Sequence, residues 1–265
     1  MSKPKLHFGD CLDIMKTIPD GSVDLILQDP PYNTTNCRFE WDIMTKIDEF
    51  WSEWNRIIKP NGAIVMFGSE PFSSKLRLSN LDMYKYDWIW HKNLSGGFVM
   101  AKKRPMKYHE NILVFFQKQP TYNPQFEEYS DSVKKMYAKN NATNVNKAIK
   151  NNYHNEVQNI KKVKCQVELK RGKYPSTVQF FKRPHTANGK SLHPTQKPTS
   201  LLEYLIKTYT NENETVFDGF AGSGSTLIAC MNTNRNGIGV ELDKKYYELA
   251  KDRIDTHKIR GSLFD

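Results

Sequence analysis

The sequence predicts an α/β protein with a mostly parallel sheet and helices on both faces. Short apolar segments alternate with amphipathic helical segments along most of the chain, which is the order that parallel sheets require. Two of the apolar segments end abruptly, one in a proline pair and the other in a run of glycines, as strands do at the ligand-binding edge of such a sheet. The length of 265 residues fits one large domain with an insertion.

The expected elements follow from the spacing of apolar residues. Between residues 46 and 58 they recur at helical spacing, as at Phe50, Trp54 and Ile58. Residues 59–62 are expected to end this helix, and residues 33–45 to form an irregular loop. In order, we expect strands at residues 6–8, 23–28, 63–67, 86–90, 111–116, 215–217 and 237–240, and helices at residues 11–18, 46–58 and 71–78, after residue 198, and at residues 225–231 and 246–256.

Residues 119–190 interrupt this pattern and hold most of the positive charge. The chain has a net charge of +10, and this segment has 14 Lys and Arg against five acidic residues, so the rest is nearly neutral. A basic segment on a neutral body indicates binding of a polyanion, although a solvated, lysine-rich linker has a similar composition. The sequence therefore divides into residues 1–118, an insertion at residues 119–190, and residues 191–265.

The composition excludes several classes of protein. The N-terminus lacks the apolar segment of a signal peptide, and no apolar run approaches the roughly 20 residues of a membrane span. The four cysteines, Cys11, Cys37, Cys165 and Cys230, are widely spaced, which predicts reduced thiols and no metal site. We expect a cytoplasmic protein that does not associate with membranes.

The tetrapeptide Asp29-Pro30-Pro31-Tyr32 directly follows the predicted strand at residues 23–28. Two successive prolines cannot continue a strand, so the chain must turn there. The turn leaves a carboxylate and an aromatic ring at the carboxyl end of a strand, where open α/β sheets bind ligands. The Asp29 carboxylate and the Pro30 carbonyl form a pair of acceptors beside the Tyr32 ring, which suits a planar substrate with an amino group. A simple strand-ending turn is the alternative.

A second motif joins a predicted strand to a glycine-rich turn and a helix start at residues 216–226. Glycines let the backbone approach a ligand closely, and free N–H groups at a helix start favour a carboxylate or phosphate. The spacing differs from the dinucleotide-binding GxGxxG, and the P-loop lysine is missing. Glu241 ends the next predicted strand, where an acidic residue typically binds the two hydroxyls of a ribose. A tight strand-to-helix turn would by itself explain the glycines, and an exposed helix start would by itself explain Glu241. These two explanations do not account for the agreement of the glycines and Glu241 in spacing and strand context.

With both motifs, the chain resembles the S-adenosylmethionine-dependent amino-methyltransferases of DNA. Residues 29–32 are similar to the catalytic motif of this family, and residues 217–222 to its cofactor motif. The order of catalytic motif, insertion and cofactor motif is the circularly permuted order of the β class. The resemblance covers roughly residues 5–118 and 191–258. It implies a Rossmann-like methyltransferase sheet whose catalytic and cofactor-binding halves flank the insertion. The insertion itself matches the family's target-recognition region by position only.

The resemblance also implies site residues. Asp29, Pro30 and Tyr32 would be catalytic. Residues 8–10 resemble the segment that contacts the cofactor's adenine, and residues 193–198 the segment that helps to hold its methionine part. The residues expected to contact the cofactor are Asp10, Cys11, Asp29, His193, Thr195, Lys197, Phe217, Asp218, Gly219, Phe220, Ala221, Gly222, Ser223, Ser225, Thr226 and Glu241.

The implied reaction transfers a methyl group from S-adenosylmethionine to an exocyclic amine of a base that is flipped out of duplex DNA. The lone pair of such an amine is delocalised into the ring. Hydrogen bonds from its two hydrogens to the Asp29 carboxylate and the Pro30 carbonyl favour the tetrahedral, nucleophilic nitrogen, and Tyr32 would stack on the base. Positioning and electrostatics then provide most of the catalysis.

The N6 amine of adenine is the favoured target, because Asp rather than Ser precedes the prolines. The N4 amine of cytosine shares the geometry and stays open as a target. The basic insertion and the motif order argue against a protein amide, and RNA is a further alternative. A catalytically silent DNA-binding subunit would carry damaged motifs, and both are intact. Methylation at carbon 5 of cytosine is excluded, because the required Pro-Cys dipeptide is absent from the sequence.

The expected macromolecular partner is double-stranded DNA. The resemblance also allows a homodimer and, as in restriction–modification systems, a cognate restriction endonuclease.

Overall fold

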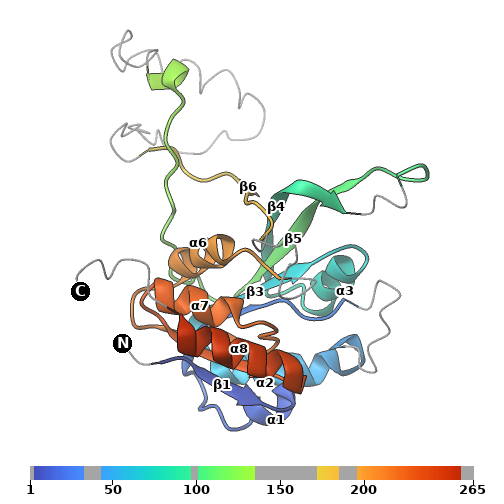
Figure 1. Cartoon of the computed structure of the whole chain (residues 1–265), viewed down its shortest axis with the longest axis vertical. Helices are drawn as coiled ribbons and strands as arrows, with labels where there is room; N and C mark the ends of the chain where they lie inside the picture. Colours follow the sequence, from blue (N-terminus) through green and yellow to red (C-terminus); the bar gives the residue numbers. More distant parts are fainter. Residues whose placement is uncertain (1–2, 33–42, 97–100, 135–171, 185–195, 258–265) are drawn as a thin grey trace. The chain divides into compact units, whose positions relative to one another are not determined.

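The structure, a computed structural model, describes residues 3–32, 43–96, 101–134, 172–184 and 196–257 (Figure 1). The chain forms two compact units, one of residues 1–123 and 176–265 and the other of residues 124–175. In the smaller unit, Glu127 and Lys173 form an isolated antiparallel bridge, and the rings of Phe126 and Tyr174 lie 4.9 Å apart. None of the helices among the described residues is both long and apolar enough to cross a membrane.

The larger unit contains an eight-stranded sheet in the order β1-β8-β7-β2-β3-β5-β4-β6. Five of the seven neighbouring pairs are parallel, and only the pairs β3–β5 and β5–β4 are antiparallel, which confirms the predicted mostly parallel sheet. The strands are β1 (Lys5–Phe8), β2 (Val23–Gln28), β3 (Ile58–Gly68), β4 (Tyr84–Gly96), β5 (Lys107–Phe115), β6 (Val178–Phe180), β7 (Thr215–Asp218) and β8 (Asn236–Glu241).

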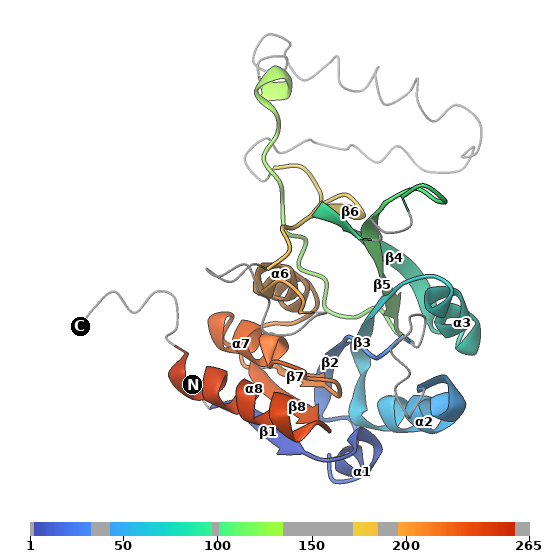
Figure 2. The same ribbon diagram turned by 45° about the vertical axis from the view of Figure 1, so that its right-hand side comes forward.

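Helices cover both faces of this sheet, as Figure 2 shows. The central strand β2 explains why both faces need cover, since alternate residues point to opposite sides of a strand. Ile26 packs in a cluster with residues of the first three helices, whereas Leu25 and Leu27 pack in a second cluster with residues of α6 and α7. The helices are α1 (Cys11–Met15), α2 (Ile47–Ile57), α3 (Phe72–Ser79), α6 (Thr199–Tyr209), α7 (Ser225–Asn232) and α8 (Lys244–Thr256), with a short 3₁₀ turn η1 (Ile43–Lys46) before α2.

Two details differ from the expected elements. Helix α2 ends at Ile57, but residues 59–62 form no separate turn, because β3 starts at Ile58 and continues through them. A shift in the register of β2 and β3 between residues 23 and 25 accommodates them. In addition, β6 lies within residues 119–190, so part of the predicted insertion joins the sheet, contrary to our expectation. The predicted loop at residues 33–45 falls mostly outside the described residues.

One edge of the sheet collects the segments that matter for function, and we call it the site edge. Strands β1, β8, β7, β2 and β3 are parallel, so their carboxyl ends share this edge. The antiparallel strand β5 begins there, because its Asn111 pairs with Gly68 at the end of β3. Glu110 pairs in turn with Trp90 of β4, which brings Lys92 to the same edge.

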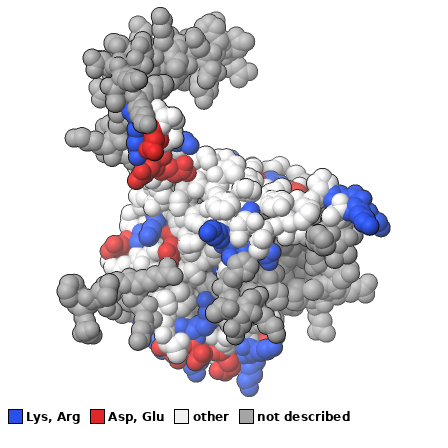
Figure 3. Space-filling model, turned by 45° about the horizontal axis from the view of Figure 1, so that its top comes forward, with Lys and Arg blue, Asp and Glu red and all other residues white. Residues whose placement is uncertain are grey.

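The hairpin that joins β4 to β5 carries exposed positive charge. Lys102, Lys103 and Arg104 are exposed, and Figure 3 shows Lys and Arg side chains gathered at this tip. Positive charge on the surface of the larger unit is therefore not confined to the predicted insertion.

Candidate active site

The Asp29 carboxylate lies at the site edge, directly after β2, and two side chains donate hydrogen bonds to it. The Tyr32 hydroxyl donates to Oδ1, and Lys197 Nζ lies 2.6 Å from Oδ2. Burial raises the pKa of Asp29, while the Lys197 ammonium opposes this rise. The rigid Pro30-Pro31 step after Asp29 limits backbone freedom at this point. The Asp29 carboxylate is therefore held in place both by its backbone and by the hydrogen bonds from Tyr32 and Lys197.

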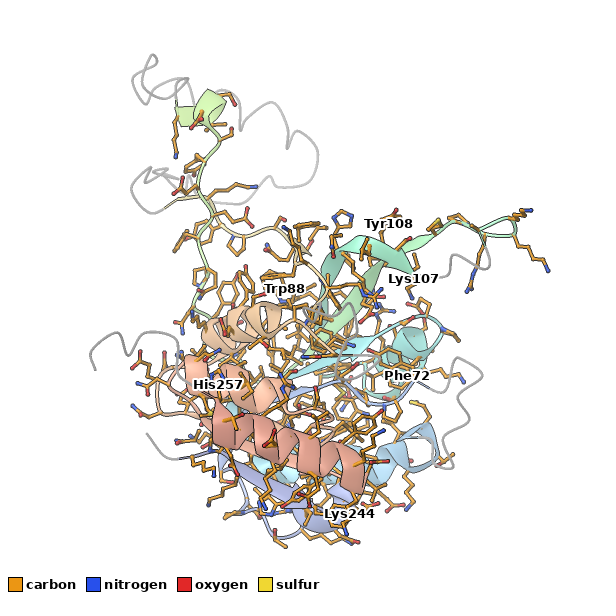
Figure 4. The ribbon with its side chains drawn as sticks, in the orientation of Figure 1. Phe72, Trp88, Lys107, Tyr108, Lys244 and His257 are labelled. Atoms are coloured by element: carbon orange, nitrogen blue, oxygen red, sulfur yellow. The ribbon has the colours of Figure 1, made fainter. Side chains whose placement is uncertain are left out.

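Tyr32 is held at its ring as well as at its hydroxyl. Its ring stacks on Phe72 at the start of α3, with centroids 5.0 Å apart and an interplanar angle of 27°; Figure 4 labels Phe72. Lys197 Nζ lies 5.7 Å from the centroid of the Tyr32 ring. The carboxylate, the aromatic ring and the ammonium therefore form one packed group rather than three independent side chains.

The glycine-rich turn follows β7, which is the neighbour of β2, so the two sequence motifs lie side by side. Asp218 ends β7, and its Oδ1 accepts a hydrogen bond of 2.9 Å from the Phe220 N–H. Burial raises the pKa of Asp218 to about 7. A Cβ on Gly219 would lie 2.4 Å from the Cys11 Sγ, so the close approach of this turn to α1 requires a residue without a side chain.

Glu241 ends β8 and fastens this turn to the sheet. Its Oε2 accepts a hydrogen bond of 2.7 Å from the Gly222 N–H, and its Oε1 accepts one of 2.8 Å from the Asp243 N–H. The Gly9 N–H donates to the Glu241 main-chain carbonyl at 3.1 Å. These bonds gather the ends of β1, β7 and β8, which the sequence predicted as cofactor-contacting segments.

The comparisons with known proteins identify the family of the chain. The family model described as DNA methylase matches residues 23–252, which is more than half of the chain. The chain belongs to the DNA methylase family. The type II methyltransferase M.HpaI of Haemophilus parainfluenzae is 30% identical to this methylase over 263 residues, with 95% of the methylase and 74% of M.HpaI covered. The DNA adenine methyltransferase YhdJ of Escherichia coli K12 is 29% identical, with 96% and 83% covered.

Solved structures share the fold of the methylase. The M1.HpyAVI–SAM complex superposes with a TM-score of 0.63 at 24% identity, over 95% of the methylase and 98% of that chain. The cytosine-N4-specific PvuII DNA methyltransferase gives a TM-score of 0.68 at 15% identity, over 100% and 89%. These similarities confirm the predicted Rossmann-like methyltransferase fold.

The structure places the predicted cofactor residues in different surroundings. Asp10 caps α1 by accepting a hydrogen bond of 2.8 Å from the Leu12 N–H. The side chains of Cys11 and Phe217 are buried in the core. Lys197 contacts the Asp29 carboxylate of the catalytic motif. His193 and Thr195 lie outside the described residues, and cofactor contact by any of these residues stays a prediction.

The start of α7 shows how the rest of the cofactor motif is supported. Ser223, Ser225 and Thr226 are buried. The Ser225 hydroxyl accepts hydrogen bonds from Gln196 Nε2 at 3.3 Å and from Arg253 Nη1 at 3.4 Å. The Arg253 guanidinium also donates to the Ser223 carbonyl. Helix α8, through Arg253, and the segment before α6, through Gln196, therefore support the end of the glycine-rich turn at the start of α7.

Sequence reasoning assigned no role to three charged residues at the site. Arg253 supports the glycine-rich turn, and Glu110 and Lys92 form an ion pair beside Lys197. One signal was available for Glu110: residues 109–111, with the strand that follows, resemble a segment of the family, and only Asn111 separates Glu110 from the apolar run of β5. No comparable signal marks Arg253, because a basic residue near the end of an amphipathic helix is ordinary.

Proposed function

We propose that this DNA methylase transfers a methyl group from S-adenosylmethionine to the N6 amine of an adenine that is flipped out of double-stranded DNA. The observation that carries the proposal is the position of Asp29. Its carboxylate lies at a strand end, held by a lysine and a tyrosine, directly beside the strand that leads into the glycine-rich turn. An acceptor for an amine next to a turn suited to an adenosyl group supports the proposal.

The residues at the glycine-rich turn fit S-adenosylmethionine. Glu241 and Asp218 provide two carboxylates at the ends of the neighbouring strands β8 and β7. Glu241 would accept hydrogen bonds from the ribose hydroxyls. S-adenosylmethionine, when bound, supplies an electrophilic methyl group on sulfur. The similar M1.HpyAVI structure is a complex with SAM, which supports the assignment.

The catalytic motif then acts by accepting hydrogen bonds. Asp29 and the Pro30 carbonyl accept the two amine hydrogens, which favours the nucleophilic nitrogen, and Asp29 must be ionised to accept strongly. The Lys197 ammonium opposes protonation of Asp29. Tyr32 would stack on the base. Adenine is favoured over cytosine because an aspartate begins the motif, and the relative YhdJ is named an adenine methyltransferase.

The basic insertion would hold double-stranded DNA mainly by contacts with the phosphates of the DNA backbone. The insertion holds 14 Lys and Arg residues against five acids.

The proposal keeps the division of the chain into three parts, at residues 1–118, 119–190 and 191–265. It also includes a homodimer and a cognate restriction endonuclease. The relative M.HpaI is named a type II methyltransferase, which supports a role in a restriction–modification system.

The role of Asp29 is tested by Asp29→Asn with Asp24→Asn as the matched control. Both aspartates lie on or directly after β2, and each pairs with a lysine at 2.6 Å. We expect Asp29→Asn to lower the single-turnover rate of methyl transfer by about 100-fold or more, with dissociation constants for cofactor and DNA changed less than about threefold. Asp24→Asn should lower stability but keep the rate. A rate for Asp29→Asn within about threefold of the wild type would contradict the proposal.

A further inference from the structure

Four charged side chains from four segments meet at the site edge. Lys197 Nζ lies 2.6 Å from Asp29 Oδ2 and 3.2 Å from Glu110 Oε2, and Lys92 Nζ pairs with Glu110 Oε1. Their side chains are only 7%, 20%, 15% and 12% exposed for Lys197, Asp29, Glu110 and Lys92. The chain Asp29–Lys197–Glu110–Lys92 alternates in sign, and its net charge is zero. We call these four residues the charge chain.

Stability alone does not explain the charge chain. Burying ions costs several kcal/mol each, and apolar residues of similar volume often stabilise a fold as well or better. The sheet does not depend on these ion pairs, because β3, β5 and β4 are already joined by their antiparallel main-chain pairing. One member, Asp29, is the proposed acceptor of the substrate amine, so the other three are best explained by what they do to Asp29.

Glu110 gives Lys197 a second partner. The Lys197 ammonium is shielded from water, since it lies 5.0 Å from the centroid of the Phe67 ring and its side chain is almost fully buried. With Asp29 as its sole partner, Lys197 would compete with a substrate amine for the same carboxylate. An ion pair with Glu110 holds the ammonium at a fixed place while Asp29 keeps acceptor capacity for the amine. Lys92 balances the charge of Glu110.

We propose that Glu110 is a positioning residue for methyl transfer: through Lys197 it fixes the position of the Asp29 carboxylate. This inference rests on the proposed role of Asp29. The titratable and charged groups that face the charge chain are Tyr32 and Asp218 near Asp29, and Arg183 near Lys92. Although burial alone would raise it, Lys197 and Lys92 lower the pKa of Glu110 to about 2, so Glu110 stays charged under assay conditions.

A double-mutant cycle tests whether Glu110 acts through Lys197. The single-turnover rate of methyl transfer is measured for wild type, Glu110→Gln, Lys197→Gln and the double variant, with dissociation constants for DNA and S-adenosylmethionine. We expect Glu110→Gln to lower the rate about tenfold or more, with both dissociation constants changed less than about threefold. We expect the double variant to match Lys197→Gln, because Glu110 has no effect once Lys197 is gone. Additive losses, or a wild-type rate for Glu110→Gln, would overturn the inference.

Two further variants separate the sources of failure. If Asp29→Asn keeps the wild-type rate, the proposed function fails; if it loses the rate while Glu110→Gln does not, only the inference fails. Should Glu110→Gln not fold, the charge-balanced variant Lys92→Gln/Glu110→Gln replaces it, because it removes one buried charge of each sign. This variant should show the same loss of rate, and a wild-type rate in it overturns the inference.

Discussion

At the scale of single residues, Asp29 is governed by two opposing effects. Burial favours the protonated acid, and the Lys197 ammonium 2.6 Å away favours the carboxylate. Sequence reasoning located Asp29 because the proline pair after a buried strand is a local signal. It could not find the contact with Lys197, which lies 168 residues further along the chain, because no local pattern encodes the meeting of two distant segments.

The pH dependence of Lys197→Gln tests this balance. Loss of the ammonium leaves burial unopposed, so the pKa of Asp29 should rise above its wild-type value. In the proposed mechanism the methyl-transfer rate requires the carboxylate, so it should fall as the pH drops through this pKa. The acidic limb of the pH–rate profile should therefore move to higher pH in single-turnover assays. An unchanged limb, or one that moves to lower pH, would show that Lys197 does not control the ionisation of Asp29.

Gly219→Ala tests the close approach of the glycine-rich turn to α1. The new Cβ would meet the Cys11 Sγ at 2.4 Å, inside a buried contact. We expect a loss of about 1–3 kcal/mol in the free energy of unfolding, together with weaker binding of S-adenosylmethionine. Gly96→Ala is the control, since its Cβ would have no neighbour closer than 3.9 Å among the residues that the structure describes. Denaturant titrations and calorimetric binding measure both effects, and equal stability of the two variants would contradict the packing described.

At the scale of elements, the sequence predicted the strands and helices of the larger unit well, except for β6. Buried strands are short apolar runs, and amphipathic helices show their period. In β6 the apolar residues Val178 and Phe180 are exposed, and the polar Gln179 between them is buried. This inverted pattern, over three residues, gives no strand signal. The antiparallel pairing of β5 could not be predicted either, because an apolar run does not indicate whether a strand runs parallel or antiparallel to its neighbours.

Tyr209 joins β4 to α6, and Tyr209→Phe tests this connection. Its hydroxyl accepts a hydrogen bond of 2.7 Å from Trp88 Nε1 and lies 3.0 Å from the Tyr86 hydroxyl. Removal of the hydroxyl leaves the Trp88 N–H buried without this acceptor, which should cost about 1–3 kcal/mol of unfolding free energy. Tyr174→Phe, at a side chain 66% exposed, should change little. Equal denaturation midpoints for the two variants would show that the bond does not stabilise the fold.

At the scale of the whole molecule, the order of the strands creates the site. Strand β2 lies between β7 and β3, so the catalytic and cofactor motifs, far apart in the sequence, end at one edge. The alternation of strands and helices predicted the fold class but not this order. Composition predicted a basic segment at residues 119–190. The smaller unit, residues 124–175, lies within the bounds of this segment. Composition cannot predict which bases such a segment reads.

The charge of the insertion predicts a steep salt dependence of DNA binding. Each phosphate contact contributes about −0.9 to the slope of log K against log salt concentration for duplex DNA. Lys161→Gln/Lys162→Gln, in the predicted insertion, should lower this slope in magnitude by about 1–2 and weaken binding at low salt. Lys5→Gln/Lys75→Gln removes two exposed lysines of the larger unit and is the control. Fluorescence anisotropy measures both, and a flat salt dependence of the wild type would remove the insertion from DNA binding.

The most direct test of the proposed reaction identifies the methylated base. Purified protein is incubated with duplex DNA of varied sequence and isotopically labelled S-adenosylmethionine, and the DNA is digested to nucleosides for mass spectrometry. Label in N6-methyldeoxyadenosine, at one sequence context and absent with Asp29→Asn, is the predicted result. Label in N4-methyldeoxycytidine would contradict the choice of base, and label that persists with Asp29→Asn would contradict Asp29 as the acceptor.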